Sequence, residues 1–111
     1  MAENAQFIPD VVKAKELIDS GAIGDVYFVK ANLHESSIES EYAAGFAEGW
    51  RSDVAQAGGG NTIDGGTHWV RALTVWMGAV EKVVAINERP FTAMAGESLT
   101  HAILRFKSGA F

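Results

Sequence analysis

The stretch from Asn61 to Met77 carries the longest regular pattern in the chain, and it limits the possible folds more than any other. Apolar residues recur along it every three or four positions, and Gly78 follows directly. This period predicts an amphipathic helix that ends at Gly78 and turns one stripe towards a core. The predicted core stripe consists of Ile63, Gly66, Val70, Leu73 and Met77. A second stripe holds Asp64, His68, Arg71 and Val75.

The other regular patterns are short and lie on both sides of this helix. Pro9 to Ser20 predicts a helix, because proline suits a first helical turn and the following Gly21 suits a C-terminal stop. Segments rich in β-branched and aromatic residues predict strands at Asp25 to Leu33, Val80 to Arg89 and Ser98 to Lys107. In the last strand the side chains predicted to face the helices are Thr100, Ala102, Leu104 and Phe106. The opposite side would carry His101, Ile103 and Arg105.

The order of these elements predicts an α+β fold in a single domain of residues 1–111. We expect a small, mostly antiparallel sheet with helices packed on one face and the other face open. An uncovered face with unpaired edges favours self-association, so we predict a homodimer or higher homo-oligomer through it. The long segment from His34 to Gly60 shows no clean period, although Tyr42 to Glu48 could form a turn of helix.

Composition excludes several classes of function. The formal net charge is −5 and the nine Lys and Arg residues are scattered, which argues against nucleic acid and anionic membranes as partners. The chain has no cysteine, which removes disulfides, thiolate zinc sites and thiol nucleophiles. The N-terminus lacks the pattern of a signal peptide, and no apolar run approaches the length of a membrane span. We therefore expect a cytoplasmic protein.

The run from Gly58 to His68 carries the candidate chemistry. Its three leading glycines end a loop and allow close approach of a ligand to the backbone. Asp64 and His68 are four residues apart, which predicts that they share one helical face in the layout of a proton-transfer site. The plainer interpretation is a capped helix start with a satisfied histidine, and the spacing alone favours it. For the glycines the plainer interpretation is a flexible loop end; no Lys-Ser/Thr pair follows, so a phosphate cradle is not expected.

Two other residue sets are interpreted as structural. A metal could in principle be shared by His34, Asp64, His68 and His101, but a third ligand would have to come from a distant segment, so we predict no metal site. Core or interface packing is expected, ahead of sugar stacking, for Trp50, Trp69 and Trp76.

Several short motifs follow one another along nearly the whole chain. They are Gln6-Phe7-Ile8-Pro9, Lys15 to Gly24, Trp50-Arg51, the Gly-Gly-Gly-x-x-x-Asp-x-Gly-x-His match at Gly58 to His68, Val83-Val84-Ala85, and Glu97 to Gly109. In this order and spacing they resemble the C-terminal half of the Gfo/Idh/MocA family. These are NAD(P)-dependent oxidoreductases named after glucose-fructose oxidoreductase and inositol dehydrogenase.

The resemblance implies roles for the candidate residues. His68 would be the catalytic acid/base, which takes the proton of a sugar or polyol hydroxyl as hydride leaves for the nicotinamide. Asp64 would contact the substrate and support that histidine, since a carboxylate steadies a charged imidazole. Trp50 and Arg51 would lie near the substrate. Arg71 stands where the family often has a second aspartate, so it either pairs with Asp64 and binds an anion or alters the pocket.

The resemblance also shows what these residues lack. Full family members begin with a Rossmann domain and a Glu-Lys-Pro motif, and no G-x-G-x-x-G follows a strand in this chain. No cofactor is therefore expected for the chain alone, and NAD(P) enters by resemblance only. We expect a fragment equivalent to the substrate-binding and oligomerisation domain, catalytically silent by itself. One alternative is a half-site completed in trans by a separate nucleotide-binding subunit; another is a purely structural self-association module.

Overall fold

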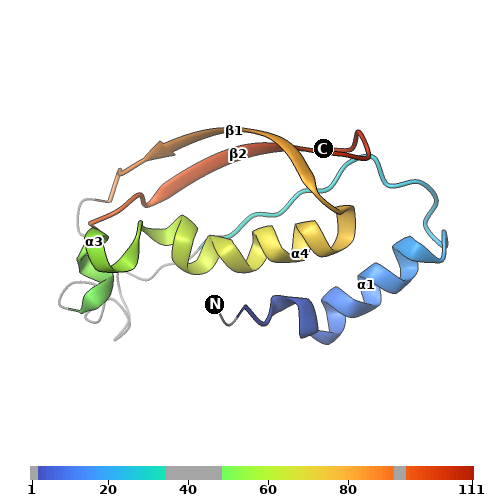
Figure 1. Ribbon diagram of the computed structural model, residues 1–111, viewed down its shortest axis with the longest axis horizontal. Helices are drawn as coiled ribbons and strands as arrows, with labels where there is room; N and C mark the ends of the chain where they lie inside the picture. The colour runs from blue at the N-terminus through green and yellow to red at the C-terminus, as the bar shows by residue number, and fades with distance from the viewer. Residues whose placement is uncertain (1–2, 35–48, 92–94) are drawn as a thin grey trace. The chain divides into compact units, whose positions relative to one another are not determined.

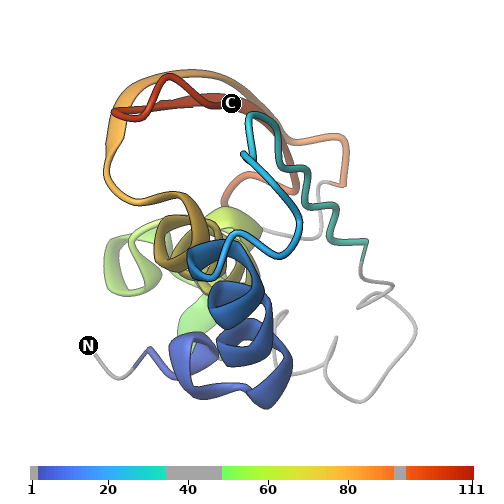
Figure 2. The same ribbon diagram turned by 90° about the vertical axis from the view of Figure 1, so that its right-hand side faces the viewer.

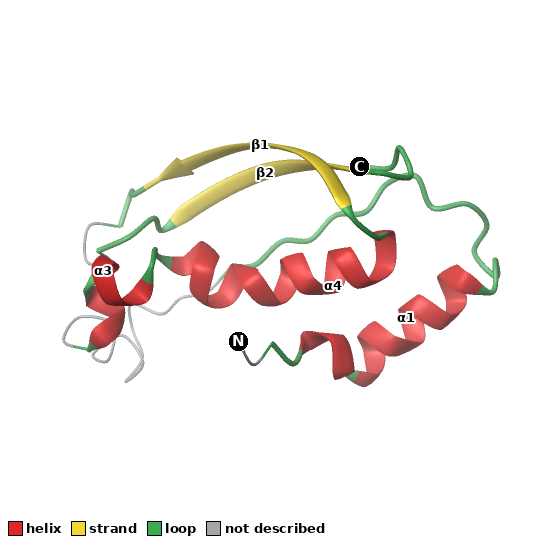
Figure 3. Ribbon diagram, in the orientation of Figure 1, coloured by secondary structure: helices red, strands yellow, loops and turns green. Residues whose placement is uncertain are grey.

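The computed structural model describes residues 3–34, 49–91 and 95–111 (Figure 1). Its elements are η1 (Ala5–Phe7), α1 (Pro9–Asp19), η3 (Trp50–Ser52), α3 (Val54–Ala57), η4 (Thr62–Gly66), α4 (Thr67–Met77), β1 (Val80–Glu88) and β2 (Leu99–Phe106) (Figure 3). The strands β1 and β2 form one two-stranded antiparallel sheet, so the predicted α+β class is confirmed. Among the described residues, no helix has the length and apolarity needed to cross a membrane. The helical turn predicted at Tyr42 to Glu48 lies outside the described residues.

The chain divides into two compact units. The first unit is Met1–Ala31, Thr67–Val84 and Ala102–Phe111. The second unit is Asn32–Gly66 and Ala85–His101. Each unit thus contains one end of the β1–β2 hairpin, and the prediction of one domain over residues 1–111 stays a prediction.

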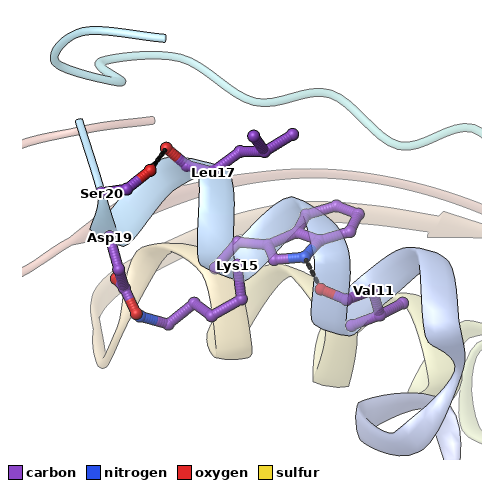
Figure 4. A network of polar contacts seen from close by, with 6 residues as sticks. Val11, Lys15, Leu17, Asp19 and Ser20 are labelled. Atoms are coloured by element: carbon purple, nitrogen blue, oxygen red, sulfur yellow. Dashed lines mark hydrogen bonds and ion pairs between the residues drawn. The ribbon is translucent and has the colours of Figure 1, made fainter. Parts of the chain in front are cut away.

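The first helix forms where the sequence predicts it. Ile8 precedes α1 in an extended conformation, Pro9 opens the helix, and the helix ends at Asp19, before Gly21. The indole N–H of Trp76 in α4 donates a hydrogen bond to the carbonyl oxygen of Val11, at 3.0 Å. Figure 4 shows this carbonyl on α1, together with the Lys15–Asp19 ion pair on the same helix. The indole therefore joins α1 to α4 within the first unit.

The apolar core lies in the first unit, between α4 and the sheet. Leu73 of α4, Phe106 of β2 and Ala110 are buried there, and Phe106 is only 1% exposed. The partly buried residues packed against them are Val29, Ala31, Trp76, Met77, Val80 and Leu104. Leu104 and Phe106 thus face the helix, and Ile103 and Arg105 are exposed, as the alternation of β2 predicts. Ala102, which was also predicted to face the helices, is exposed, so within the first unit the predicted buried side of β2 is covered only near its end.

The predicted core stripe of the long helix is correct only in its second half. Leu73 is buried and Met77 packs against the core, but Ile63 and Val70 are exposed. Ile63 falls in η4, which is a π-helical turn, so the α-helical period does not extend back to it. Val70 lies one turn before Leu73, and the core contacts of α4 are made by Leu73, Trp76 and Met77.

The strand predicted at Asp25 to Leu33 is wrong. The segment is extended, but it forms no ladder with β1 or β2. Instead Val29 donates its N–H to the carbonyl of Phe111 at 2.8 Å, and Phe111 donates to the carbonyl of Tyr27 at 3.1 Å. Figure 2 shows this segment beside the end of the chain. Because the pairing involves a single residue of the opposite segment, β-branched composition alone does not make a strand here.

Large apolar side chains remain exposed on the sheet. In the first unit these are Val83, Val84 and Ile103, each more than half exposed. Contiguous apolar patches on a protein surface often mark interaction sites. Successive side chains of a strand point to opposite faces, so Val83 lies with Ile103 on the face away from α4 and Val84 lies on the other face. The expected open face is present among the described residues and carries Val83 and Ile103.

Candidate functional site

Three of the predicted site residues lie together in the second unit; we call Trp50, Arg51 and Asp64 the Arg51 cluster. Arg51 donates from Nε to Oδ2 of Asp64 at 2.9 Å and from Nη2 to Oδ1 at 3.5 Å. Both side chains are about 30% exposed, at 29% and 30%. The guanidinium carbon of Arg51 also lies 4.3 Å from the ring centroid of Trp50. A planar cation is thus held between a carboxylate and an aromatic face, which restricts its orientation.

Local backbone geometry places these side chains. The short helix η3 presents Trp50 and Arg51 next to each other, and Asp64 lies in the π-helical turn η4. The N–H of Asp64 donates to the carbonyl of Gly60 at 3.2 Å. The sequence predicts an α-helix from Asn61, so the π-helical turn is a correction. Such turns are rare and occur often at functional sites, where they change the direction of a side chain.

Glu97, in the connection between β1 and β2, holds the start of this turn. Its Oε2 accepts the N–H of Gly60 at 2.8 Å, and its Oε1 accepts the N–H of Thr62 at 3.1 Å. The N–H of Asn61 donates to the backbone carbonyl of Glu97 at 2.9 Å. We call this set of contacts the Glu97 clasp. It satisfies three consecutive backbone donors at a helix start, which otherwise lack intrahelical partners.

The glycines of the motif are needed for the clasp. A Cβ on Gly60 would lie 2.1 Å from the carbonyl oxygen of Glu97, and a Cβ on Gly96 would lie 2.3 Å from the nitrogen of Gly60. Gly58 ends α3 in the left-handed conformation, with φ of 84°. The close approach expected for a ligand is thus made, at Gly60, by another part of the backbone.

The clasp also determines the ionisation of Glu97. Burial raises the pKa of this carboxyl, but hydrogen bonds from the backbone N–H groups of Gly60 and Glu97 and from Thr62 outweigh burial and lower the pKa below its ordinary value. The carboxylate is therefore charged at neutral pH. Its negative charge faces N–H donors, the electrostatic arrangement favoured at a helix start.

The Gly-rich loop does not fit a dinucleotide phosphate. Consecutive N–H groups at a helix start can form an anion-binding concavity. Here the N–H groups of Gly60 and Thr62 are occupied by the Glu97 carboxylate, and that of Asn61 by the Glu97 carbonyl. The chain therefore supplies its own anion where a phosphate would have to bind.

His68 and Arg71 lie in the first unit and contact the N-terminal segment. The Nδ1 of His68 is 2.7 Å from Oε2 of Glu3, and Arg71 donates from Nη2 to Oε1 of Gln6. The hydrogen bond with His68 lowers the pKa of the Glu3 carboxyl, with further lowering from the N–H of Ala5 and from the charge of Arg71. Glu3 is thus an ionised partner of the candidate acid/base.

The predicted site residues therefore form two groups. Trp50, Arg51 and Asp64 belong to the second unit, and His68 and Arg71 to the first. The shared face of Asp64 and His68 stays a prediction, as does the pairing of Arg71 with Asp64. Each of these residues has a side-chain partner within its own unit: Arg51 for Asp64, Glu3 for His68 and Gln6 for Arg71.

The three tryptophans differ in their surroundings. Trp76 packs against the core of the first unit, as expected. Trp50 is 52% exposed and lies beneath Arg51, so it is not a core residue. Trp69 is also exposed, at 39%. Of the three, Trp50 combines an accessible ring with a neighbouring charged pair.

Two carboxylates of these sites, Glu97 and Glu3, are not identified by the sequence patterns. Both act on partners distant in sequence, Glu97 by 37 residues from Gly60 and Glu3 by 65 residues from His68. The one local signal for Glu97 is the preceding Gly96, in the connection between two predicted strands. Within residues 3–34, 49–91 and 95–111, no group of three or more potential ligand residues is placed to hold a metal ion.

The family model described as the GFO/IDH/MocA C-terminal domain matches residues 11–111. The chain belongs to this family. The resemblance inferred from the motifs is therefore confirmed. No curated protein matches the chain.

Solved structures share the fold. An oxidoreductase from Thermotoga maritima is 28% identical, with a TM-score of 0.74 over 99% of this chain and 33% of its own. An oxidoreductase from Agrobacterium radiobacter, solved with NAD+, L-tartaric acid and magnesium, is 22% identical, with a TM-score of 0.68 over 97% of this chain and 29% of its own. GenD2 from gentamicin A biosynthesis, solved with NAD, is 24% identical, with a TM-score of 0.72 over 98% of this chain and 30% of its own. The chain thus spans about a third of the length of these proteins.

Proposed function

We propose that residues 1–111 are the substrate-binding and oligomerisation domain of an NAD(P)-dependent oxidoreductase that acts on a polyol, sugar or hydroxy acid. The observation that carries the proposal is the Arg51 cluster. The family motifs imply a place near the substrate for each of its three residues, and Arg51 contacts both Asp64 and Trp50. Family membership and the NAD-bound neighbours support the reaction class.

The chemistry divides between this chain and residues outside it. When an alcohol is oxidised, its O–H loses a proton and the neighbouring carbon loses a hydride as the carbonyl forms. His68 would accept the proton, because an imidazole can act as a base near neutral pH. A nicotinamide cofactor would supply the hydride acceptor, and the Gly-rich loop would not hold its phosphates, because Glu97 occupies the N–H groups of Gly60 and Thr62.

The Arg51 cluster would bind and orient the substrate. Arg51 and Asp64 are partly exposed, so a ligand hydroxyl can hydrogen-bond to either of them without complete separation of the pair. The exposed ring of Trp50 adds an apolar surface suited to the C–H groups of a sugar. This combination of a few oriented polar groups beside an aromatic ring is typical of small-molecule sites.

The test is a nuclear magnetic resonance titration of the protein with polyols, sugars and small hydroxy acids. We expect weak binders that shift the indole N–H resonance of Trp50, and loss of binding in Asp64→Asn. The matched control is Asp19→Asn, which alters an exposed ion pair on α1 and should leave binding unchanged. A panel without a single binder, or equal binding by Asp64→Asn, contradicts the proposal.

A second titration tests whether the chain acts alone. Calorimetry with NAD and NADP should show no binding to residues 1–111, and no turnover should follow with any bound alcohol. Dinucleotide binding with a defined stoichiometry would contradict the assignment of the cofactor to residues outside this chain. A nucleotide-binding subunit that co-purifies and restores turnover would establish completion in trans.

We also propose that the exposed sheet face mediates self-association. Val83 and Ile103 support this role, because they lie on the same face of the sheet and each is more than half exposed. Sedimentation equilibrium should give a dimer or larger oligomer, and Ile103→Lys should lower its mass towards that of a monomer. Val12→Lys, a matched apolar-to-lysine change at an exposed position on α1, is the control. A monomeric wild-type protein contradicts this part of the proposal.

A further inference from the structure

Glu3 contacts the one imidazole that the proposed function uses. Its Oε2 lies 2.7 Å from Nδ1 of His68, and its side chain is only 12% exposed, whereas that of His68 is 53% exposed. A carboxylate held on one ring nitrogen leaves the other ring nitrogen, Nε2, for an external partner. This is the relation between an orienting acid and a histidine base in many enzymes.

Glu3 is fixed although it lies near the start of the sequence. Its second oxygen, Oε1, accepts the backbone N–H of Ala5, and Ala5 is buried at 3% exposure. Gln6, in the same segment, accepts a hydrogen bond from Arg71, three residues beyond His68 in α4. The segment is therefore attached to α4 by two side-chain contacts, and the position of the carboxylate is defined.

The protonation state of Glu3 determines what it can do to the imidazole. The hydrogen bond from His68, followed by the N–H of Ala5 and the charge of Arg71, keeps the pKa of Glu3 below its ordinary value. An ionised carboxylate can only accept hydrogen bonds. Whenever His68 is neutral, the proton must therefore be on Nδ1, and Nε2 must carry the lone pair.

We propose that Glu3 is a positioning residue for His68, which holds its neutral imidazole as the Nδ1–H tautomer and so presents Nε2 as the proton acceptor. This inference rests on the proposed function for its purpose, but the tautomer itself needs neither substrate nor cofactor. In the described part of the first unit, the Glu3–His68 pair has one further charged group acting on it, Arg71, whose positive charge lowers the pKa of Glu3. Glu3 acts through His68 and is not itself a catalytic residue.

Nitrogen-15 shifts of the histidine rings test the proposal at a pH where His68 is neutral. We expect Nδ1–H to predominate at His68 in the wild type and at least a threefold fall in the Nδ1–H to Nε2–H ratio in Glu3→Ala. Glu3→Gln keeps an acceptor oxygen and should retain part of the preference. His34 and His101 provide internal references whose ratios should not change. Glu16→Ala is the matched control, because Glu16 pairs with Lys13 on exposed α1.

Two results would overturn the proposal. One is a wild-type His68 with no more Nδ1–H tautomer than His34 and His101. The other is a ratio at His68 that is unchanged in Glu3→Ala while the amide spectrum of α4 stays that of the folded protein. Both can be observed whether or not a polyol or sugar binds, so failure here is distinct from failure of the proposed function.

Discussion

The two units of the chain are stabilised by different kinds of interaction. The buried hydrophobic residues of the described structure, Ala5, Val11, Ala72, Leu73, Phe106 and Ala110, all belong to the first unit. In the described part of the second unit only Gly60 is buried, and it is held by the Glu97 clasp. Apolar packing is non-directional, whereas the clasp depends on hydrogen-bond geometry and on the charge of one carboxylate. The units should therefore differ in their response to mutation and to pH.

Phe106→Ala should cause the largest loss of stability, because it removes the most buried side chain of the first unit. Truncation of a buried aromatic residue costs about 4 kcal/mol in the free energy of unfolding. Urea denaturation followed by circular dichroism measures this loss. Phe7→Ala is the control, since Phe7 is exposed, and it should cost less than about 1 kcal/mol. Equal losses for the two variants would show that the apolar core does not stabilise the first unit.

Gly60→Ala should be the most damaging small change in the second unit. The added Cβ would overlap the backbone of Glu97, which is not able to move aside like a flexible side chain. Overpacking of this kind costs about 3 kcal/mol. Gly66→Ala is a matched control in the same motif, because its Cβ would meet its nearest neighbour at 3.5 Å, an ordinary contact. Urea denaturation measures the stability of both variants. If Gly60→Ala is as stable as Gly66→Ala, the second unit does not depend on the close backbone contact of the Glu97 clasp.

Acid should loosen the second unit by protonating Glu97. Since folding lowers the pKa of Glu97 from an ordinary value of 4.5, its contribution is complete above that pH and is lost as the pH falls through the lower folded value. The amide resonances of Gly60 and Thr62 should therefore titrate together below pH 4.5, while that of Leu73 in the apolar core should not.

Glu97→Gln provides the control for this titration. The variant keeps the side-chain size but has no proton to gain, so the two amide resonances should no longer follow pH. Glu88→Gln, at an exposed position on β1, should leave the titration intact. Persistent titration of Gly60 and Thr62 in Glu97→Gln would assign the effect to another carboxyl and remove the clasp as its cause.

Arg51→Lys should have a small effect on stability, and it tests whether the Arg51 cluster contributes more to the second unit than an ordinary surface ion pair does. Lysine cannot make the two-nitrogen contact with Asp64 or stack on Trp50 as a plane. Because the pair is partly exposed, we expect a loss of about 0.7 kcal/mol. Lys15→Ala, which removes an exposed pair on α1, should cost about 0.3 kcal/mol. If Arg51→Lys costs no more than Lys15→Ala, the Arg51 cluster is an ordinary surface pair.

Local patterns in the sequence predict the regular elements well. Pro9 and Gly21 bracket α1, and Gly78 follows α4, because proline and glycine act on the backbone where they stand. The strands β1 and β2 fall within one residue of their predicted bounds at each end. The failure at Asp25 to Leu33 has a different cause, since a strand exists only if another segment pairs with it.

The candidate site is less predictable, because its supports are distant in sequence. The motif identifies Asp64 and His68, but not that Glu97 orders the turn around Asp64 or that Glu3 contacts His68. The π-helical turn was also missed, since the spacing of Asp64 and His68 fits an α-helix equally well. Residue identity thus indicates which groups carry the chemistry, while tertiary contacts determine how they are held.

Both units contain tryptophan, which can serve as an optical label. Trp50 lies in the second unit with a guanidinium over its ring, and Trp76 lies in the first unit with its N–H bonded to a backbone carbonyl. These surroundings differ in polarity and in solvent contact, so the two indoles should emit at different wavelengths. Because Trp69 also lies in the first unit, variants that keep only one of the three tryptophans would let fluorescence follow the melting of either unit without any added dye.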